Sequence, residues 1–92
     1  MKVYIVTVED FKKKHFYNTG VYSNPEAAAE EVRATVEYYK NQDGYDKDKI
    51  VGMTEGYAFS GKFADFTMML ENCEVFIDVE LWNVLDEVRV WA

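Results

Sequence analysis

The sequence predicts one α+β domain over residues 1–92, with a mainly antiparallel sheet of four to five strands and one principal helix packed on one face. Three observations predict this fold. The chain opens with β-branched and aromatic residues, a capped amphipathic segment follows, and a segment of strict alternation lies near the C-terminus. A chain of 92 residues has enough apolar material for one hydrophobic core.

The first two predicted strands form a hairpin. Residues 2–9 carry apolar side chains on both faces, which suits a strand that is covered on both sides. Residues 16–22 form the second strand, after a charged connection that contains the run Lys12-Lys13-Lys14. Within the second strand, Asn18-Thr19-Gly20 predicts a bulge or a turn.

The helix is predicted over about residues 25–41. Ser23 and Glu26 have the spacing of a capping box, and Pro25 falls in the first turn, where no amide partner is lost. Residues 41–44, Asn-Gln-Asp-Gly, end the helix. The apolar stripe that should face the sheet comprises Ala29, Val32, Val36 and Tyr39.

The second half of the chain is predicted to be mostly strand. A polar loop over residues 44–49 leads to a strand over 50–59, and residues 62–72 fit either a short helix or a strand. Residues 74–82 alternate between two faces, and a last strand over about 87–91 can pair with them. One face has Val75, Ile77, Val79 and Leu81; the other has Glu74, Phe76, Asp78, Glu80 and Trp82.

The net charge of −7 is concentrated in the second half of the chain. Residues 1–49 have eight Lys or Arg against nine Asp or Glu, whereas residues 50–92 have two against eight. An acidic balance disfavours direct binding to nucleic acid or to an anionic membrane, and it favours a basic protein partner. The alternative is that the acidic residues serve solubility alone.

Known catalytic and metal-binding patterns are incomplete. His15 and Cys73 are the only histidine and cysteine, too few for a His/Cys zinc site. Residues 46–48, Asp-Lys-Asp, lack the spacing of a calcium loop. Gly56–Lys62 matches the glycines and lysine of a phosphate-binding loop, but Phe63 occupies the position of the magnesium ligand. We therefore expect that the chain is not an enzyme and that it binds no cofactor or metal. A small enzyme or nucleotide binder that uses Gly56–Lys62 is the third alternative, after the two binding roles described below.

A cytoplasmic location is expected. The chain has a single cysteine, so no internal disulfide can form, which favours a reducing compartment. No apolar run approaches the ~20 residues that a membrane span needs, and the N-terminus is charged too early for a signal peptide.

The predicted partner-binding surface combines acidic residues with aromatic ones. Aromatic side chains flanked by carboxylates offer both an apolar anchor and a charge complement to a Lys- or Arg-rich partner. If a helix covers this face instead, Phe76 and Trp82 belong to the core, and the sequence leaves both alternatives open. The predicted set comprises Asp65, Glu71, Glu74, Phe76, Asp78, Glu80, Trp82, Asp86 and Glu87.

The opening segment Met1–Val8 and the segment Gly20–Val32, with its Ser-Asn-Pro-Glu-Ala start of a helix, resemble small uncharacterised bacteriophage proteins. The resemblance covers about a third of the chain, ends near residue 40, and transfers no functional residue. It implies a phage accessory protein acting in the host cytoplasm. That class includes acidic inhibitors that imitate DNA toward targets such as the histone-like HU protein, host polymerase or CRISPR effectors.

The sequence thus favours a non-enzymatic accessory protein. Its expected role is to bind, and in the narrower hypothesis to inhibit, a basic host protein such as a DNA-binding protein through an acidic, DNA-mimicking surface. The alternative is a structural or homo-oligomeric accessory protein, for example a homodimer formed by an exposed strand.

Overall fold

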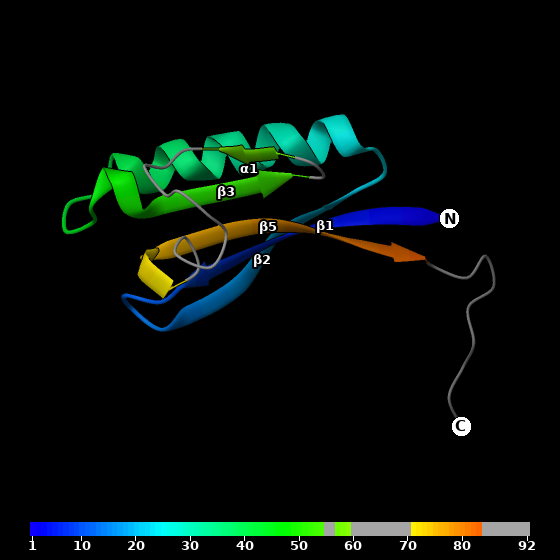
Figure 1. Ribbon diagram of the computed structural model, residues 1–92. Coiled ribbons are helices and arrows are strands. Elements are labelled where there is room, and N and C mark those ends of the chain that lie inside the picture. The colour runs from blue at the N-terminus through cyan, green and yellow to red at the C-terminus, as the bar shows by residue number, and fades with distance from the viewer. Residues whose placement is uncertain (55–56, 60–70, 84–92) are drawn as a thin grey trace, which may run out of the picture.

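The computed structural model describes residues 1–54, the backbone of 57–59, and residues 71–83. Five strands form one mixed sheet in the order β2-β1-β5-β3-β4, and α1 packs on one side of it (Figure 1). This confirms the predicted α+β class. The elements are β1 (Lys2–Asp10), β2 (His15–Tyr22), α1 (Pro25–Lys40), η1 (Lys47–Lys49), β3 (Ile50–Thr54), β4 (Tyr57–Phe59) and β5 (Val75–Asn83).

The hairpin of β1 and β2 forms as predicted, including its bulge. Val6 lies opposite Gly20, but the next residue, Thr7, lies opposite Asn18, so Thr19 is the extra residue of β2. An extra residue on one strand is what defines a β-bulge. The connection over residues 11–14 includes Lys14 at a positive φ of 54°.

The N-terminus of α1 differs from the prediction by one residue. Asn24, and not Ser23, is the N-cap, and its Oδ1 accepts a hydrogen bond from the Ala27 amide at 2.8 Å. The reason lies in Pro25, which disfavours the helical conformation in the residue before it and is itself suited to the first helical position. Asn24 therefore stays extended, with φ −138° and ψ 152°, as an N-cap requires.

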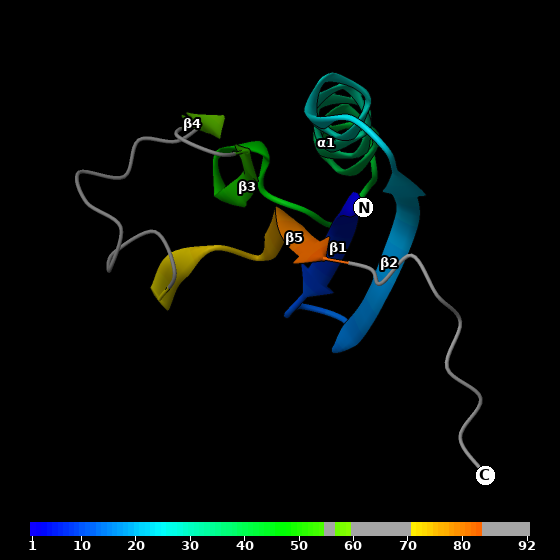
Figure 2. The ribbon, with the colours of Figure 1, turned by 90° about the vertical axis from the view of Figure 1, so that its right-hand side faces the viewer.

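The buried side of α1 packs on the sheet, as Figure 2 shows in a view turned by 90°. Val32, Val36 and Tyr39 are buried as predicted, whereas Ala29 is only half-buried, and Ala28 and Thr35 are buried in addition. The core that they form with the sheet also includes Val6, Val8, Ile50, Val75 and Ile77.

The segment 50–59 is not the single strand that was predicted. β3 and β4 are two short antiparallel strands, with Gly52 opposite Phe59 and Thr54 opposite Tyr57. In the sequence, only Glu55 and Gly56 separate β3 from β4. A glycine in a two-residue link between β-prone segments is a hairpin signal, although the β-propensity of the whole segment favours one continuous strand.

β5 lies inside the sheet. It pairs with β1 antiparallel along its whole length, and with β3 parallel only over Val75–Ile77. Of the ambiguous segment 62–72, only Glu71 and Asn72 are described, and both are helical. The predicted strand over 87–91 lies outside the described residues. Across the described ranges, we find no helix with the length and apolar character of a bilayer span.

Candidate functional site

The alternation predicted for β5 is present. Val75 and Ile77 are fully buried in the core beneath α1, and Val79 packs against that core. The intervening residues point to the opposite face, because successive side chains of a strand alternate. We call that opposite side of β1, β2 and β5, away from α1, the open face.

The two aromatic residues of β5 have different environments. Phe76 is only 7% exposed and packs with Val51 and Cys73. Trp82 is 54% exposed, and its Nε1 donates a hydrogen bond to Glu80 Oε2 at 3.0 Å. Phe76 is thus a core residue, whereas Trp82 is available to a partner.

Glu74 differs from the acids that follow it, because its carboxylate has partners within the chain. Oε1 accepts the Asp46 amide at 2.7 Å, and Oε2 lies 3.4 Å from Lys12 Nζ. The Glu74 carbonyl also accepts the Phe11 amide at 2.9 Å. Glu74 therefore ties the β1–β2 turn to the loop before η1, and it contributes little free charge to a binding surface.

Asp78 and Glu80 remain as the acids of the open face on β5. Across the pairing with β1 they lie opposite Thr7 and Ile5, and Glu9 lies opposite Phe76. Directly opposed residues of paired strands share a face, so Glu9 is a third carboxylate of the open face. Among the described residues of β1, β2 and β5 that point to this face, none is Lys or Arg.

Glu9 is not in the predicted set, because the apolar residues of 2–9 predict a strand that is covered on both sides. In the structure, α1 covers one face only, and Glu9 is exposed. The signal was present, since Glu9 continues the alternation of Val3, Ile5 and Thr7.

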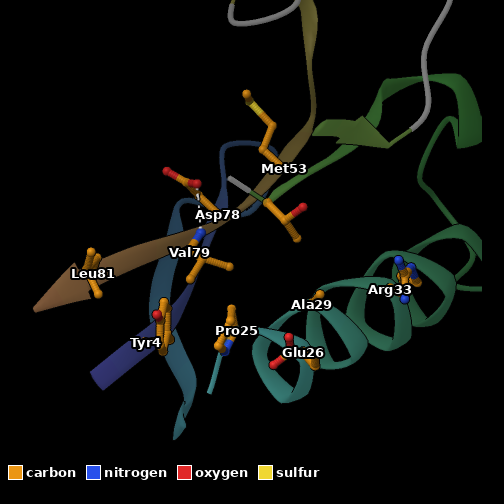
Figure 3. A pocket seen from close by; sticks show the side chains of 10 residues that line it. Tyr4, Pro25, Glu26, Ala29, Arg33, Met53, Asp78, Val79 and Leu81 are labelled. Atoms are coloured by element: carbon orange, nitrogen blue, oxygen red, sulfur yellow. Dashed lines mark hydrogen bonds between the residues drawn. The ribbon is translucent and has the colours of Figure 1, made fainter. Parts of the chain in front are cut away.

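A groove of about 620 Å³ lies beside the second half of β5, where β3 no longer pairs with it (Figure 3). Apolar side chains from four elements line it, and Asp78 lies on its β5 side. Glu26 and Arg33 of α1 add one charge of each sign. The apolar lining comes mainly from Tyr4, Ala29, Met53, Val79 and Leu81.

No family model, curated protein or solved structure gives a significant match to this chain. The chemistry of the site therefore rests on its own residues.

Asp78 is the most unusual acid of the open face. It is half-buried, and its Oδ1 accepts the amide of the next residue, Val79, at 2.7 Å. Burial raises the pKa of the Asp78 carboxyl above its ordinary value; the nearby Glu80 charge adds to this rise, and the bond from the Val79 amide opposes it. An acid with a raised pKa is destabilising when it is ionised, which indicates a cost to the fold at neutral pH.

We expect Asp78→Asn to raise the melting temperature at neutral pH. Because the folded-state pKa lies above the unfolded-state pKa, ionised Asp78 destabilises the fold above the folded-state pKa, and this penalty disappears as the pH falls through it. The asparagine keeps an oxygen for the Val79 amide. Thermal melts from neutral to acidic pH should show a gain that shrinks on acidification. A gain that is equal at every pH, or a loss at neutral pH, would contradict this account.

The remaining predicted residues lie apart or outside the described ranges. Glu71 is exposed in the helical turn before β5. Asp65, Asp86 and Glu87 lie outside the described residues, as does most of the Gly56–Lys62 segment, of which Tyr57–Phe59 form β4.

The residues considered for chemistry have structural surroundings. His15 is exposed, with its ring centroid 4.6 Å from that of Tyr17. Cys73 is buried and in no disulfide, and burial raises the pKa of its thiol. Asp46 caps η1 by accepting the Asp48 amide at 3.0 Å. Within the described ranges, no group of three or more His, Cys, Asp or Glu side chains is placed to hold a metal ion.

Proposed function

We propose that this chain is a non-enzymatic binding protein whose open face engages a Lys- or Arg-rich surface of another protein. The observation that supports the proposal is the exposed ring of Trp82, which is hydrogen-bonded to Glu80, with Asp78 on the same face of β5. Carboxylates around an exposed aromatic residue provide a charge complement and an apolar anchor together.

The narrower form of the proposal concerns the partner. A nucleic-acid-binding protein fits best, because such proteins concentrate Lys and Arg where phosphates bind, and an acidic competitor can use the same cluster. Occupation of that cluster would inhibit the partner. The resemblance of the N-terminal third to phage proteins and the presence of a single cysteine suit action in a bacterial cytoplasm.

The proposal is tested by capture of proteins from a bacterial lysate on the immobilised chain, at low and at moderate salt. We expect a basic protein to be retained at low salt and released as the salt is raised, because exposed charges are screened. The double variant Asp78→Lys/Glu80→Lys should weaken this binding at least about a hundredfold, as like charges then face the partner.

The matched control is Glu30→Lys/Glu37→Lys, which makes the same change of charge on exposed positions of α1. If both double variants lose binding equally, the net charge alone is responsible and the open face is not the site. Retention of full binding by Asp78→Lys/Glu80→Lys would refute the proposal.

A second candidate function is homo-oligomerisation through the end of β5. The observation in its favour is that Leu81 and Trp82 are both about half exposed, at 51% and 54%. Light scattering would reveal it as a dimer that persists at moderate salt.

A further inference from the structure

The second half of β5 has an edge without a described partner. The register of β1 with β5 and the bond from the Phe11 amide to the Glu74 carbonyl direct the backbone groups of the even-numbered residues of β5 to β1, and those of the odd-numbered residues to the side of β3. Glu74 itself precedes β5, and its amide donates to the Lys49 carbonyl at 2.8 Å. β3 pairs with β5 only as far as Ile77. Among the described residues, no strand therefore pairs with the backbone groups of Val79, Leu81 and Asn83 on that side.

The hydrogen bond of Val79 agrees with this geometry. Its amide donates to the side chain of its neighbour, Asp78, at 2.7 Å, a local substitute for a partner strand. A carbonyl of an added strand can take the place of that carboxylate. Asp78 would then be released to pair with a cation of the same added strand.

The two faces next to this edge differ in chemistry. On the side of α1 lies the apolar groove, which Val79, Leu81 and Tyr4 line together (Figure 3). On the open face lie Asp78, Glu80 and Trp82. The side chains of an added strand would alternate between the groove and the acidic residues.

We propose that residues 78–83 of β5 bind an extended peptide segment of the partner, in which apolar residues alternate with Lys or Arg, by adding it to the sheet as a strand. This inference rests on the proposed function and specifies how the partner is recognised. The backbone hydrogen bonds would provide affinity, and the alternate side chains would provide specificity. A strand of this length covers about 20 Å.

The charges favour such a segment over a second copy of this chain. Antiparallel pairing of β5 with itself keeps the two sets of even-numbered side chains on one face, so it gathers Asp78 and Glu80 of both copies there, and neighbouring like charges destabilise a strand pair. Each copy also has a net charge of −7. A Lys-containing strand instead places cations beside Asp78 and Glu80.

The first test uses a capped synthetic peptide of about ten residues in which Val and Lys alternate. Its binding to the full chain is compared with that of a peptide of the same composition in which the lysines are grouped at one end. We expect the alternating peptide to bind at least about tenfold more tightly, since only it can satisfy both faces at once.

Two N-methylated forms of the alternating peptide test the backbone pairing directly. In antiparallel addition the amides of the Val residues point to β5, whereas in parallel addition those of the Lys residues do. Methylation of one set should therefore abolish binding, and methylation of the other set should leave it nearly unchanged. If both forms bind, or neither binds, strand addition is overturned.

A protein variant provides an independent test. Leu81→Pro removes an amide that points away from β1, so the β1–β5 ladder keeps its bonds, whereas Leu81→Ala removes only the side chain. We expect Leu81→Pro to bind the alternating peptide at least about tenfold more weakly than Leu81→Ala, with circular dichroism spectra unchanged. Equal affinity in the two variants would count against the edge.

The outcomes separate this inference from the proposed function. If the alternating peptide fails to bind, but a basic lysate protein is still captured and lost in Asp78→Lys/Glu80→Lys, the open face stands and the edge is overturned. If neither the alternating peptide nor a basic lysate protein binds, both the proposed function and the strand addition are wrong. A salt-resistant dimer that Leu81→Pro dissociates would show that the edge takes a second copy, and would overturn the peptide as its occupant.

Discussion

Phe76→Ala is expected to lower the free energy of unfolding by about 3–5 kcal/mol, the largest single effect on stability that we predict. Phe76 is 7% exposed and packs with Val51, Cys73 and the partly buried Met53. Truncation removes most of a large apolar side chain from these contacts and leaves a cavity. Urea unfolding, with the midpoint and the slope both determined, measures the change.

Trp82→Ala is the matched substitution on the same face of the same strand. Trp82 is 54% exposed, so we expect a change in stability within about 0.5 kcal/mol. Partner binding should nevertheless weaken about tenfold or more, because exposed aromatic residues are frequent anchors of interfaces. A stability loss in Trp82→Ala as large as that in Phe76→Ala would contradict the assignment of one residue to the core and the other to the surface.

The alternation of residues 74–82 could be predicted because it depends on the chain alone: a strand has a period of two. The different environments of Phe76 and Trp82 could not be predicted, because they depend on partners distant in the sequence. Phe76 lies opposite Val51 of β3, whereas the pairing of β3 with β5 ends at Ile77, before Trp82. No local pattern indicates where two parallel strands separate.

The same reasoning applies to the acidic residues. The alternation groups Glu74 with Asp78 and Glu80, but in the structure the Glu74 carboxylate pairs with Lys12 and accepts the Asp46 amide. The alternation of residues 74–82 cannot indicate Glu9, which belongs to the open face only through the pairing of β1 with β5. Within the described residues, the first two strands, the helix and β5 were therefore predicted correctly. Which residues share the open face depends in addition on the register between strands.

Tyr45→Phe is expected to lower the free energy of unfolding by about 1–3 kcal/mol, although it removes a single oxygen atom. Asp10, at the end of β1, is 2% exposed. Its Oδ2 accepts the Tyr45 hydroxyl, and its Oδ1 accepts the Lys13 amide at 2.9 Å. The substitution leaves one oxygen of a buried carboxylate without this donor, and an unsatisfied buried polar group costs more than an average hydrogen bond contributes.

Tyr38→Phe is the control for this change. Tyr38 is 57% exposed on α1, so loss of its hydroxyl should alter stability by no more than about 0.5 kcal/mol. Because Tyr45 lies near the β1–β2 turn and not near residues 78–83, partner binding by folded Tyr45→Phe should equal that of the original chain. Equal stability of the two tyrosine variants would mean that the Tyr45–Asp10 bond contributes nothing.

Alkaline pH gives a second measure of the same contact. Burial, and then the bond to Asp10, raise the pKa of Tyr45 well above its ordinary value of 10.0. The folded state therefore keeps a proton that the unfolded state loses, so this stabilisation is complete below pH 10 and is lost as the pH rises through the folded-state pKa. Tyr45→Phe lacks this dependence, so its stability should fall less steeply above pH 10. Parallel curves for the two proteins would show that the raised pKa has another origin.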